Sequence, residues 1–132
     1  TEEAFNFYKS VFGGEFTYLG RFKDMPADEN CQPSSEEEGN RIMHVSLPIS
    51  KETILMGSDS TSFSGDVIFG NNFSVSINTN SKEEADKLFN GLSANGTIIM
   101  PMEKTFWGAY FGMFTDKFGI NWMVNFDEVP AS

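Results

Sequence analysis

The chain has 132 residues, the length of one compact domain, and its 39% hydrophobic and 14% aromatic residues suffice for a packed core, which excludes intrinsic disorder. Its formal net charge of −10 repels phosphate backbones and anionic lipid surfaces, so we expect no nucleic acid and no membrane among its partners. A single cysteine, Cys31, excludes a disulfide within the chain, and no apolar run approaches the ~20 residues of a membrane span, so we expect a cytoplasmic protein.

The first predicted element is an amphipathic helix that begins at Thr1 and ends at Gly13-Gly14. Thr1 suits the N-cap position, and the acidic residues after it face the positive end of the helix dipole. The apolar side chains recur at helical spacing: Ala4, Phe5, Tyr8, Val11 and Phe12. From Glu15 to Lys23 the pattern changes to alternation, which predicts a strand with Phe16, Tyr18 and Phe22 on one face.

The segment 24–40 is polar and acidic, contains Pro26 and Pro33, and has no periodicity, so we expect a long loop. Three interpretations of this loop stay open: a lid over a site, a dimer contact, or a mobile surface segment. Cys31 lies in it without a basic neighbour that would favour the thiolate, so we do not expect Cys31 to act as a nucleophile.

Two strands are predicted next, from Ile42 to Ile49 and from Thr53 to Ser58. Pro48 has no backbone N–H, which places the end of the first of these strands at a sheet edge. A second loop covers residues 60–71. It leads into a half-buried strand in which apolar residues alternate with polar ones: Phe73, Val75 and Ile77.

A second amphipathic helix is predicted to begin at Ser81. The run Ser81-Lys82-Glu83-Glu84 is a capping box, in which the Ser81 hydroxyl caps the helix and Glu84 reaches back. The apolar stripe of this helix consists of Ala85, Leu88, Phe89 and Leu92. Asn95-Gly96 closes the helix, and a short strand runs from Thr97 to Met100.

Large rings alternate with glycines between Met100 and Trp122. We interpret this stretch as two antiparallel strands, at about 106–114 and 120–126, around a turn at Asp116 to Gly119. Such a hairpin lines a core or a cavity, and it carries no evident catalytic groups. Its rings are Phe106, Trp107, Tyr110, Phe111, Phe114, Phe118 and Trp122.

The two predicted helices match at one fixed offset, and three strands follow each of them. The matching pairs are Glu2-Glu3-Ala4 with Glu83-Glu84-Ala85, Phe7-Tyr8 with Leu88-Phe89, and Val11 with Leu92. We therefore expect one domain, 1–132, built of module one (1–60) and module two (71–127). The complete module is a βαβββ unit, and the leading strand of module one is expected before Thr1.

This plan resembles the vicinal oxygen chelate superfamily of glyoxalases, bleomycin-resistance proteins and extradiol dioxygenases. Three segments resemble in order its PhnB-like branch, which has also been labelled 3-demethylubiquinone-9 3-methyltransferase: EEAFNFYKSVFGGEF, IMHVSLPISKETILMGSD and MPMEKTFWGAYFGMFTDKFGINWMV. The resemblance covers almost the whole chain. It implies an α+β fold in which two βαβββ modules form a cup-shaped sheet, and it implies a homodimer.

In metal-using members of this superfamily, His, Gln or Glu ligands come from the leading and last strands of each module. Carried over by the resemblance, the ligand positions of the last strands fall on Leu55 or Met56 and on Met123. The leading strand of module two offers Asn72, Ser74 or Ser76. Methionine is a soft, weak ligand for hard divalent cations, so we expect no metal and no cofactor.

Five residues are candidates for contact with a ligand: His44, Met56, Trp107, Phe111 and Met123. His44, the only histidine, acts either as a general base or hydrogen-bond donor in the cup, or as a strand residue at the edge of the core. Trp107 either stacks on a planar ligand or belongs to the core, and Met56 and Met123 are expected to line the pocket.

The resemblance leaves two main functions open. The first is a metal-free protein that binds a small apolar or aromatic molecule. The second is an enzyme, either a metal-dependent lyase or dioxygenase or the methyltransferase of the family label. The chain lacks the glycine-rich loop and the alternating strand-helix plan of a nucleotide-type pocket, which disfavours the methyltransferase. A module that serves only in protein assembly is a third possibility.

Overall fold

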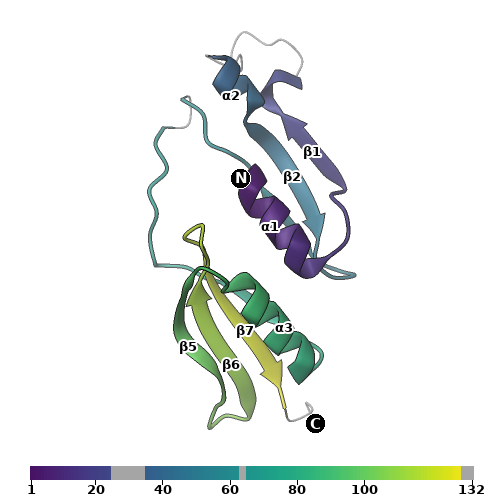
Figure 1. Ribbon diagram of the computed structural model, residues 1–132, viewed down its shortest axis with the longest axis vertical. Helices are drawn as coiled ribbons and strands as arrows, with labels where there is room; N and C mark the ends of the chain where they lie inside the picture. Colours follow the sequence, from purple (N-terminus) through teal and green to yellow (C-terminus); the bar gives the residue numbers. More distant parts are fainter. Residues whose placement is uncertain (25–34, 63–64, 129–132) are drawn as a thin grey trace. The chain divides into compact units, whose positions relative to one another are not determined.

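The computed structural model describes residues 1–24, 35–62 and 65–128 (Figure 1). The chain divides into two compact units, unit 1 (Thr1–Ile68) and unit 2 (Phe69–Ser132). Both contain helix and a β-sheet, so the fold is mixed α+β, as the sequence predicts. None of the helices in the described segments is long and apolar enough to span a membrane.

Unit 1 packs the helix α1 (Glu2–Phe12) against a three-stranded antiparallel sheet. The strands are β1 (Tyr18–Arg21), β2 (Ile42–Pro48) and β3 (Ile54–Gly57), in the order β1-β2-β3. A 3₁₀ helix, η1 (Phe22–Asp24), follows β1, and a short helix, α2 (Glu36–Asn40), precedes β2.

The core of unit 1 lies between α1 and one face of this sheet. The rings of Phe5 and Tyr8 are buried and meet edge to face with centroids 5.5 Å apart. On β2, Val45 and Leu47 are fully buried. A Cβ added at Gly57 would lie 2.5 Å from the Phe5 ring, so only glycine at this position lets α1 pack so closely on β3.

Two predictions for unit 1 are wrong in detail. The strand at 15–23 has only four residues, Tyr18–Arg21, and Tyr18 is half exposed because α1 packs on the opposite face of the sheet. The loop at 24–40 contains a helix, α2, whose first turn is capped by Ser35: the Ser35 hydroxyl oxygen accepts a hydrogen bond from the Glu38 N–H at 3.1 Å. Residues 25–34, with Cys31 and the three interpretations of the loop, lie outside the described residues.

Pro48 lies at an edge, as predicted, but only because the pairing of its strand with β1 stops before it. β2 is the central strand of the sheet, but its register with β1 ends at Ser46. Pro48 pairs with Ile54 of β3, and among the described strands it has a partner on this side only, so its missing N–H interrupts no ladder on the other side.

Unit 2 has the complete βαβββ order. β4 (Val75–Asn78) precedes α3 (Lys82–Leu92), and β5 (Thr97–Lys104), β6 (Ala109–Thr115) and β7 (Asn121–Asp127) follow. The sheet order is β4-β7-β6-β5, with β4 parallel to β7 and the other pairs antiparallel. The strands of unit 1 have the same order after their helix, so β3 corresponds to β7. Within the described part of unit 1, β3 pairs with β2 only.

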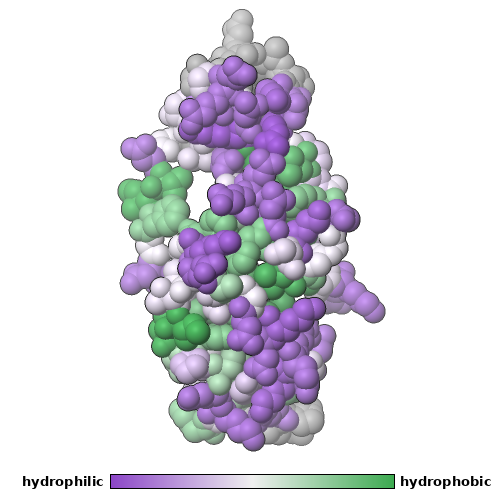
Figure 2. Space-filling model, viewed as in Figure 1, coloured by the Kyte–Doolittle hydropathy of each residue, from purple (hydrophilic) through white to green (hydrophobic). Residues whose placement is uncertain are grey.

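The second helix confirms the predicted capping box with one difference. Ser81 Oγ accepts the Glu84 N–H at 3.1 Å, but the Glu84 carboxylate accepts the N–H of Asn80 rather than that of Ser81. The predicted stripe is buried, and Phe89 meets Phe114 of β6 edge to face at 5.1 Å. Hydrophilic residues gather over α3 in the lower part of Figure 2, where the helix faces solvent.

β5 is longer than predicted, because it continues past Pro101 to Lys104. β5 is an edge strand, and its register with β6 shifts on both sides of Met100. A proline is accommodated at such an irregular edge, where a missing N–H breaks no ladder.

The predicted aromatic hairpin is confirmed, with a first strand that starts at Ala109 because residues 106–108 form a turn. At the predicted turn between β6 and β7, Asp116 Oδ1 accepts hydrogen bonds from the N–H groups of Phe118 and Ile120. Gly119 has a φ of 89°, a conformation that favours glycine.

Candidate functional site

Each sheet has a face that its helix covers and an opposite face, which we call the open face. In unit 2, Phe114 contacts Phe89 of α3, and a Cβ added at Gly112 would meet the same ring at 2.8 Å. Gly112 and Phe114 therefore face α3. Because successive strand residues point to opposite sides, Phe111 and Met113 lie on the open face.

The centre of the open face of unit 2 is apolar and rich in sulfur. Met113 of β6 and Met123 of β7 are direct cross-strand partners, and Phe111 lies two residues before Met113 on the same face. The ring of Trp107, in the turn before β6, lies 6.2 Å from the Phe111 ring at an interplanar angle of 63°. The structure thus brings Trp107 and Phe111 together, with Met123 on the neighbouring strand.

Oriented polar groups adjoin this apolar centre. Asn125 Nδ2 donates hydrogen bonds of 3.1 Å to Asn78 Oδ1 and to Asp127 Oδ1. Thr115 Oγ1 donates to Asn121 Oδ1 at 2.7 Å. Apolar walls with a few fixed polar groups are the usual lining of small-molecule sites, so this face has the composition of a binding surface.

The turn that carries Trp107 is held firmly at its base. The N–H of Thr105 donates to the carbonyl of Ala109 at 2.8 Å, and the Ala109 N–H donates to Thr105 Oγ1 at 3.1 Å. At the tip, Phe106 is 97% exposed and Trp107 is 58% exposed, with ring centroids 4.9 Å apart. An ordered turn that holds two large rings in solvent is a candidate contact for a ligand or partner.

The open face of unit 1 carries the other two predicted residues, His44 and Met56. Met56 of β3 is the cross-strand partner of Ser46, and Tyr18 of β1 is the partner of Ser46 on the other side. His44 Nε2 lies 2.9 Å from Ser46 Oγ, within hydrogen-bond distance, and the rings of His44 and Tyr18 are 5.8 Å apart. His44 and Met56 are therefore neighbours through Ser46, which sequence reasoning did not select.

The two open faces correspond position by position. The pair Ser46–Met56 joins β2 and β3 in unit 1 as the pair Met113–Met123 joins β6 and β7 in unit 2. His44, two residues before Ser46, then corresponds to Phe111. Four of the five predicted site residues thus occupy two equivalent pairs of positions.

The donor atoms at the positions of the family's metal ligands do not fit a hard divalent cation. Met123 lies beside Ser76 of β4, and Met56 lies beside Ser46. Thioether sulfur and neutral hydroxyl groups bind hard cations weakly. In the segments that the structure describes, no group of three or more His, Cys, Asp or Glu side chains is arranged to hold a metal ion.

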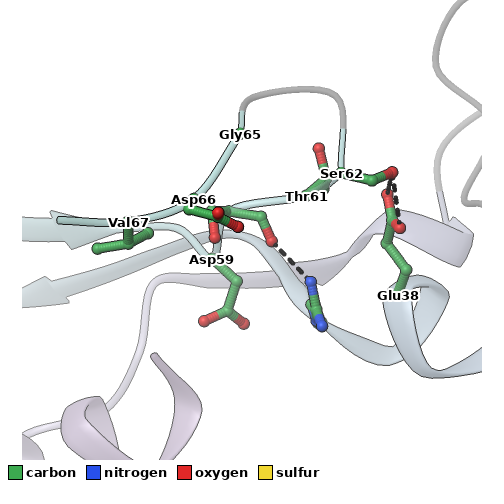
Figure 3. A pocket seen from close by; sticks show the side chains of 9 residues that line it. Glu38, Asp59, Thr61, Ser62, Gly65, Asp66 and Val67 are labelled. Atoms are coloured by element: carbon green, nitrogen blue, oxygen red, sulfur yellow. Dashed lines mark hydrogen bonds between the residues drawn. The ribbon is translucent and has the colours of Figure 1, made fainter.

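A polar groove of about 700 Å³ lies elsewhere in unit 1, between α2 and the segment that follows β3 (Figure 3). The Ser62 hydroxyl donates to the Glu38 carboxylate at 3.1 and 3.3 Å, as the dashed lines show. Arg41 Nη1 donates to the carbonyl of Ser60 at 3.2 Å. These groups satisfy one another, and none of the five predicted site residues lines the groove.

Asp59, at the wall of the same groove, fastens the end of β3 to the rest of unit 1. Burial by itself raises the pKa of Asp59, but hydrogen bonds from Thr1 and from the Ile42 N–H outweigh burial, and the net pKa lies below its ordinary value. The Ile42 N–H donates to Asp59 Oδ2 at 2.7 Å. We therefore interpret Asp59 as a structural carboxylate.

Known proteins resemble this chain along most of its length. The family profile described as Glyoxalase/Bleomycin resistance protein/Dioxygenase superfamily matches residues 1–124. Protein YjdN of Escherichia coli (strain K12) is 33% identical over an alignment of 132 positions, which covers 93% of this chain and 85% of that protein.

Two solved structures extend the comparison. Protein PA1353 of Pseudomonas aeruginosa is 38% identical with a TM-score of 0.80, over 95% of this chain and 87% of that chain. The PhnB protein of Bacillus cereus, which is named for a 3-demethylubiquinone-9 3-methyltransferase, is 28% identical with a TM-score of 0.69, over 95% of this chain and 89% of that chain. These likenesses confirm the glyoxalase-like α+β fold and the resemblance to the PhnB-like branch. The chain belongs to the Glyoxalase/Bleomycin resistance protein/Dioxygenase superfamily.

Proposed function

We propose that the protein binds a small apolar or aromatic molecule on the open face of unit 2, without a metal ion. The observation that carries the proposal is the cluster of Trp107, Phe111, Met113 and Met123 on the sheet face opposite α3. A molecule placed on this cluster removes apolar surface from water, at about 25 cal/mol for each Å² buried.

The scaffold supports selective binding because three of the four contact residues, Phe111, Met113 and Met123, come from ordered strands. β6 and β7 pair without a break over seven residues, from Ala109 opposite Asp127 to Thr115 opposite Asn121. Side chains on such strands are positioned more precisely than side chains on loops. The thioethers of Met113 and Met123 adapt to the outline of a ring and make favourable contacts with it.

The name of the B. cereus relative refers to a reaction on a small molecule, which is compatible with a small-molecule ligand for this chain. The weak donor set described above favours a metal-free site over a lyase or dioxygenase that works through a hard metal ion.

We also propose that the protein forms a homodimer. β5 is an edge strand, and its residues Ile98, Ile99 and Met100 expose apolar side chains in succession. An exposed apolar edge is a site at which a second copy of a chain commonly pairs. Gel filtration coupled to light scattering is expected to show a dimer at micromolar concentration, and a monomer across this range would remove this part of the proposal.

The binding proposal is tested by metal analysis followed by calorimetry. Purified protein is first analysed for bound metal by mass spectrometry, and it is then titrated with 2-methylnaphthalene and 2-naphthol. We expect no stoichiometric metal and saturable binding. Trp107→Ala should weaken binding about tenfold, as expected for the loss of one ring–ring contact with its buried area.

Phe106→Ala is the matched control, because Phe106 is a ring of the same turn that is 97% exposed, whereas the Trp107 ring lies against Phe111 of the open face. We expect it to change the affinity less than about threefold, in line with the small effect of surface substitutions. Metal near one atom per chain, together with stabilisation by Mn or Zn, would overturn the metal-free proposal and favour the enzyme.

A further inference from the structure

The open face of unit 1 carries a polar pair where unit 2 carries apolar side chains. His44 and Ser46 occupy the positions that Phe111 and Met113 occupy in unit 2. Their side chains are within hydrogen-bond distance, with His44 Nε2 2.9 Å from Ser46 Oγ. The flanking methionine, Met56, has its counterpart in Met123. The two faces thus share a thioether and differ in the pair beside it.

An aromatic ring is held next to this polar pair. A Cβ added at Gly20 would come within 3.0 Å of the Tyr18 ring and hydroxyl, so the Tyr18 side chain folds along β1 over Gly20. Gly20 is the cross-strand partner of His44, and the Tyr18 ring accordingly lies 5.8 Å from the imidazole. The glycine makes room for the tyrosine beside His44.

These side chains differ in how much of their surface is exposed to solvent. Ser46 is 7% exposed, whereas half of Tyr18 and 58% of Met56 are open to solvent. His44 is half-buried. A polar pair with a buried serine, between an exposed ring and an exposed thioether, has the form of a small recognition site: the apolar walls accept a ring, and the polar pair accepts one hydrogen-bonding group.

We propose that Tyr18, His44, Ser46 and Met56 form a site for an aromatic ring that carries a hydroxyl group. Tyr18 and Met56 contact the ring, and the His44–Ser46 pair exchanges a hydrogen bond with the hydroxyl. The proposal rests on the proposed function in that the ligand is aromatic, and it adds a second contact surface and the chemical class of the ligand.

A hydroxyl group complements this pair better than a carbonyl or an ionised acid does. If Ser46 donates to Nε2, its oxygen has free lone pairs and needs a donor; if Nε2–H donates to Ser46, the serine hydroxyl needs an acceptor. A ligand hydroxyl is donor and acceptor at once and satisfies both arrangements. The net charge of −10 in addition disfavours an anionic ligand.

The test uses methionine methyl resonances, because Met56 and Met123 report the two open faces separately. Protein with ¹³C-methyl methionine is titrated with 2-naphthol and with 2-methylnaphthalene, which carries a methyl group in place of the hydroxyl. Met56→Leu and Met123→Leu assign the two signals among those of the seven methionines. We expect 2-naphthol to saturate the Met56 signal at about tenfold lower concentration than 2-methylnaphthalene, the preference that one satisfied hydrogen bond provides.

His44→Phe and Ser46→Ala should each bring the ratio of the two saturating concentrations at Met56 from about ten to about one. Both variants should leave the titration followed at Met123 unchanged. His44→Phe installs the residue that unit 2 has at the equivalent position, so it keeps an aromatic ring there. Gly20→Ala displaces the Tyr18 ring, so it should weaken the binding of both probes as followed at the Met56 signal. Thermal melts identify any variant that is unfolded. If either His44→Phe or Ser46→Ala fails to fold, the titration of the other variant tests the proposal.

Three outcomes separate this inference from the proposed function. A Met123 signal that responds to the probes while Met56 stays still overturns the inference and leaves the proposed function standing. Equal saturation of Met56 by both probes overturns the hydroxyl preference. Loss of all response at both methionines removes the proposed function and the inference with it.

Discussion

The indole N–H of Trp122 donates a hydrogen bond of 2.8 Å to Asp116 Oδ2, and both side chains are buried. The other oxygen of this carboxylate accepts the N–H groups of Phe118 and Ile120. A single aspartate therefore fixes the turn between β6 and β7 and ties it to the core of unit 2. The register of these two strands places Met113 opposite Met123, so Asp116 supports the open face as well.

We predict that Asp116→Ala lowers the free energy of unfolding by about 3 kcal/mol, because it leaves buried donors without their charged acceptor. Urea unfolding followed by circular dichroism measures this change. Lys117→Ala, at an exposed neighbouring position in the same turn, should stay within about 0.5 kcal/mol of the parent. Equal effects of the two substitutions would contradict the role assigned to Asp116.

Gly112 is the second position at which the structure predicts a clear loss of stability. A Cβ there would lie 2.7 Å from Met102 Sδ, 2.8 Å from the Phe89 ring and 3.1 Å from the Met100 carbonyl. Gly112→Ala should therefore push α3 away from β6 and lower the free energy of unfolding by about 1–3 kcal/mol. Gly70→Ala, whose nearest neighbour would be 3.5 Å away, is the control, and a larger loss there would refute the packing argument.

Tyr110 should titrate at unusually high pH. Its hydroxyl donates a hydrogen bond of 2.6 Å to Asp86 Oδ1, and this bond, followed by burial and the charge of Asp86, raises the pKa of Tyr110 to about 12. Because the pKa in the folded state lies above the unfolded value of about 10, the contribution to stability is complete below pH ~10 and is lost as pH rises through about 12. Near-ultraviolet absorbance measures the ionisation.

The control for this titration is Asp86→Asn, which removes the charge and keeps a hydrogen-bonding group. The highest tyrosine step should move toward about 10 in this variant, and it should vanish in Tyr110→Phe. If the Asp86→Asn protein titrated like the parent, the hydrogen bond would not be the cause of the raised pKa.

The two tryptophans provide a matched pair for stability. Trp122 is 1% exposed in the core, whereas Trp107 lies on an exposed turn. Trp122→Ala should lower the free energy of unfolding by about 3–5 kcal/mol, while Trp107→Ala should lower it by less than about 1 kcal/mol. Denaturant titrations of both variants measure the difference. A core-sized loss for Trp107→Ala would place this residue among the packing residues.

Local signals in the sequence are sufficient to predict the two long helices, α1 and α3, and the aromatic hairpin. Ser81 and Glu84 specify a helix start through their own hydrogen bonds, and Asp116 and Gly119 specify a turn. The strand predicted at 15–23 is shorter in the structure, and its alternation shows that a strand has two faces but does not show which one its helix covers. Helix α2 has five residues, too few to produce a periodic pattern.

The residues of the candidate site also divide into those that the sequence indicates locally and those that only strand pairing brings together. His44 and Trp107 attract attention as residue types, and Met56 and Met123 were selected through the family resemblance. Ser46 and Tyr18 were missed because their roles depend on cross-strand pairing, which joins residues distant in the sequence. The alternation of His44 with Ser46 on one strand is the signal in the sequence that could have found the serine.

The central claim is that an aromatic molecule binds beside Trp107. The most direct measurement is ¹⁹F NMR of protein with 5-fluorotryptophan, in which Trp107→Phe assigns the two signals, during titration with 2-naphthol. We predict that the Trp107 signal shifts in a saturable way while the signal of Trp122, buried in the core, stays fixed. A Trp107 signal that does not respond, or two signals that shift together, would contradict the account.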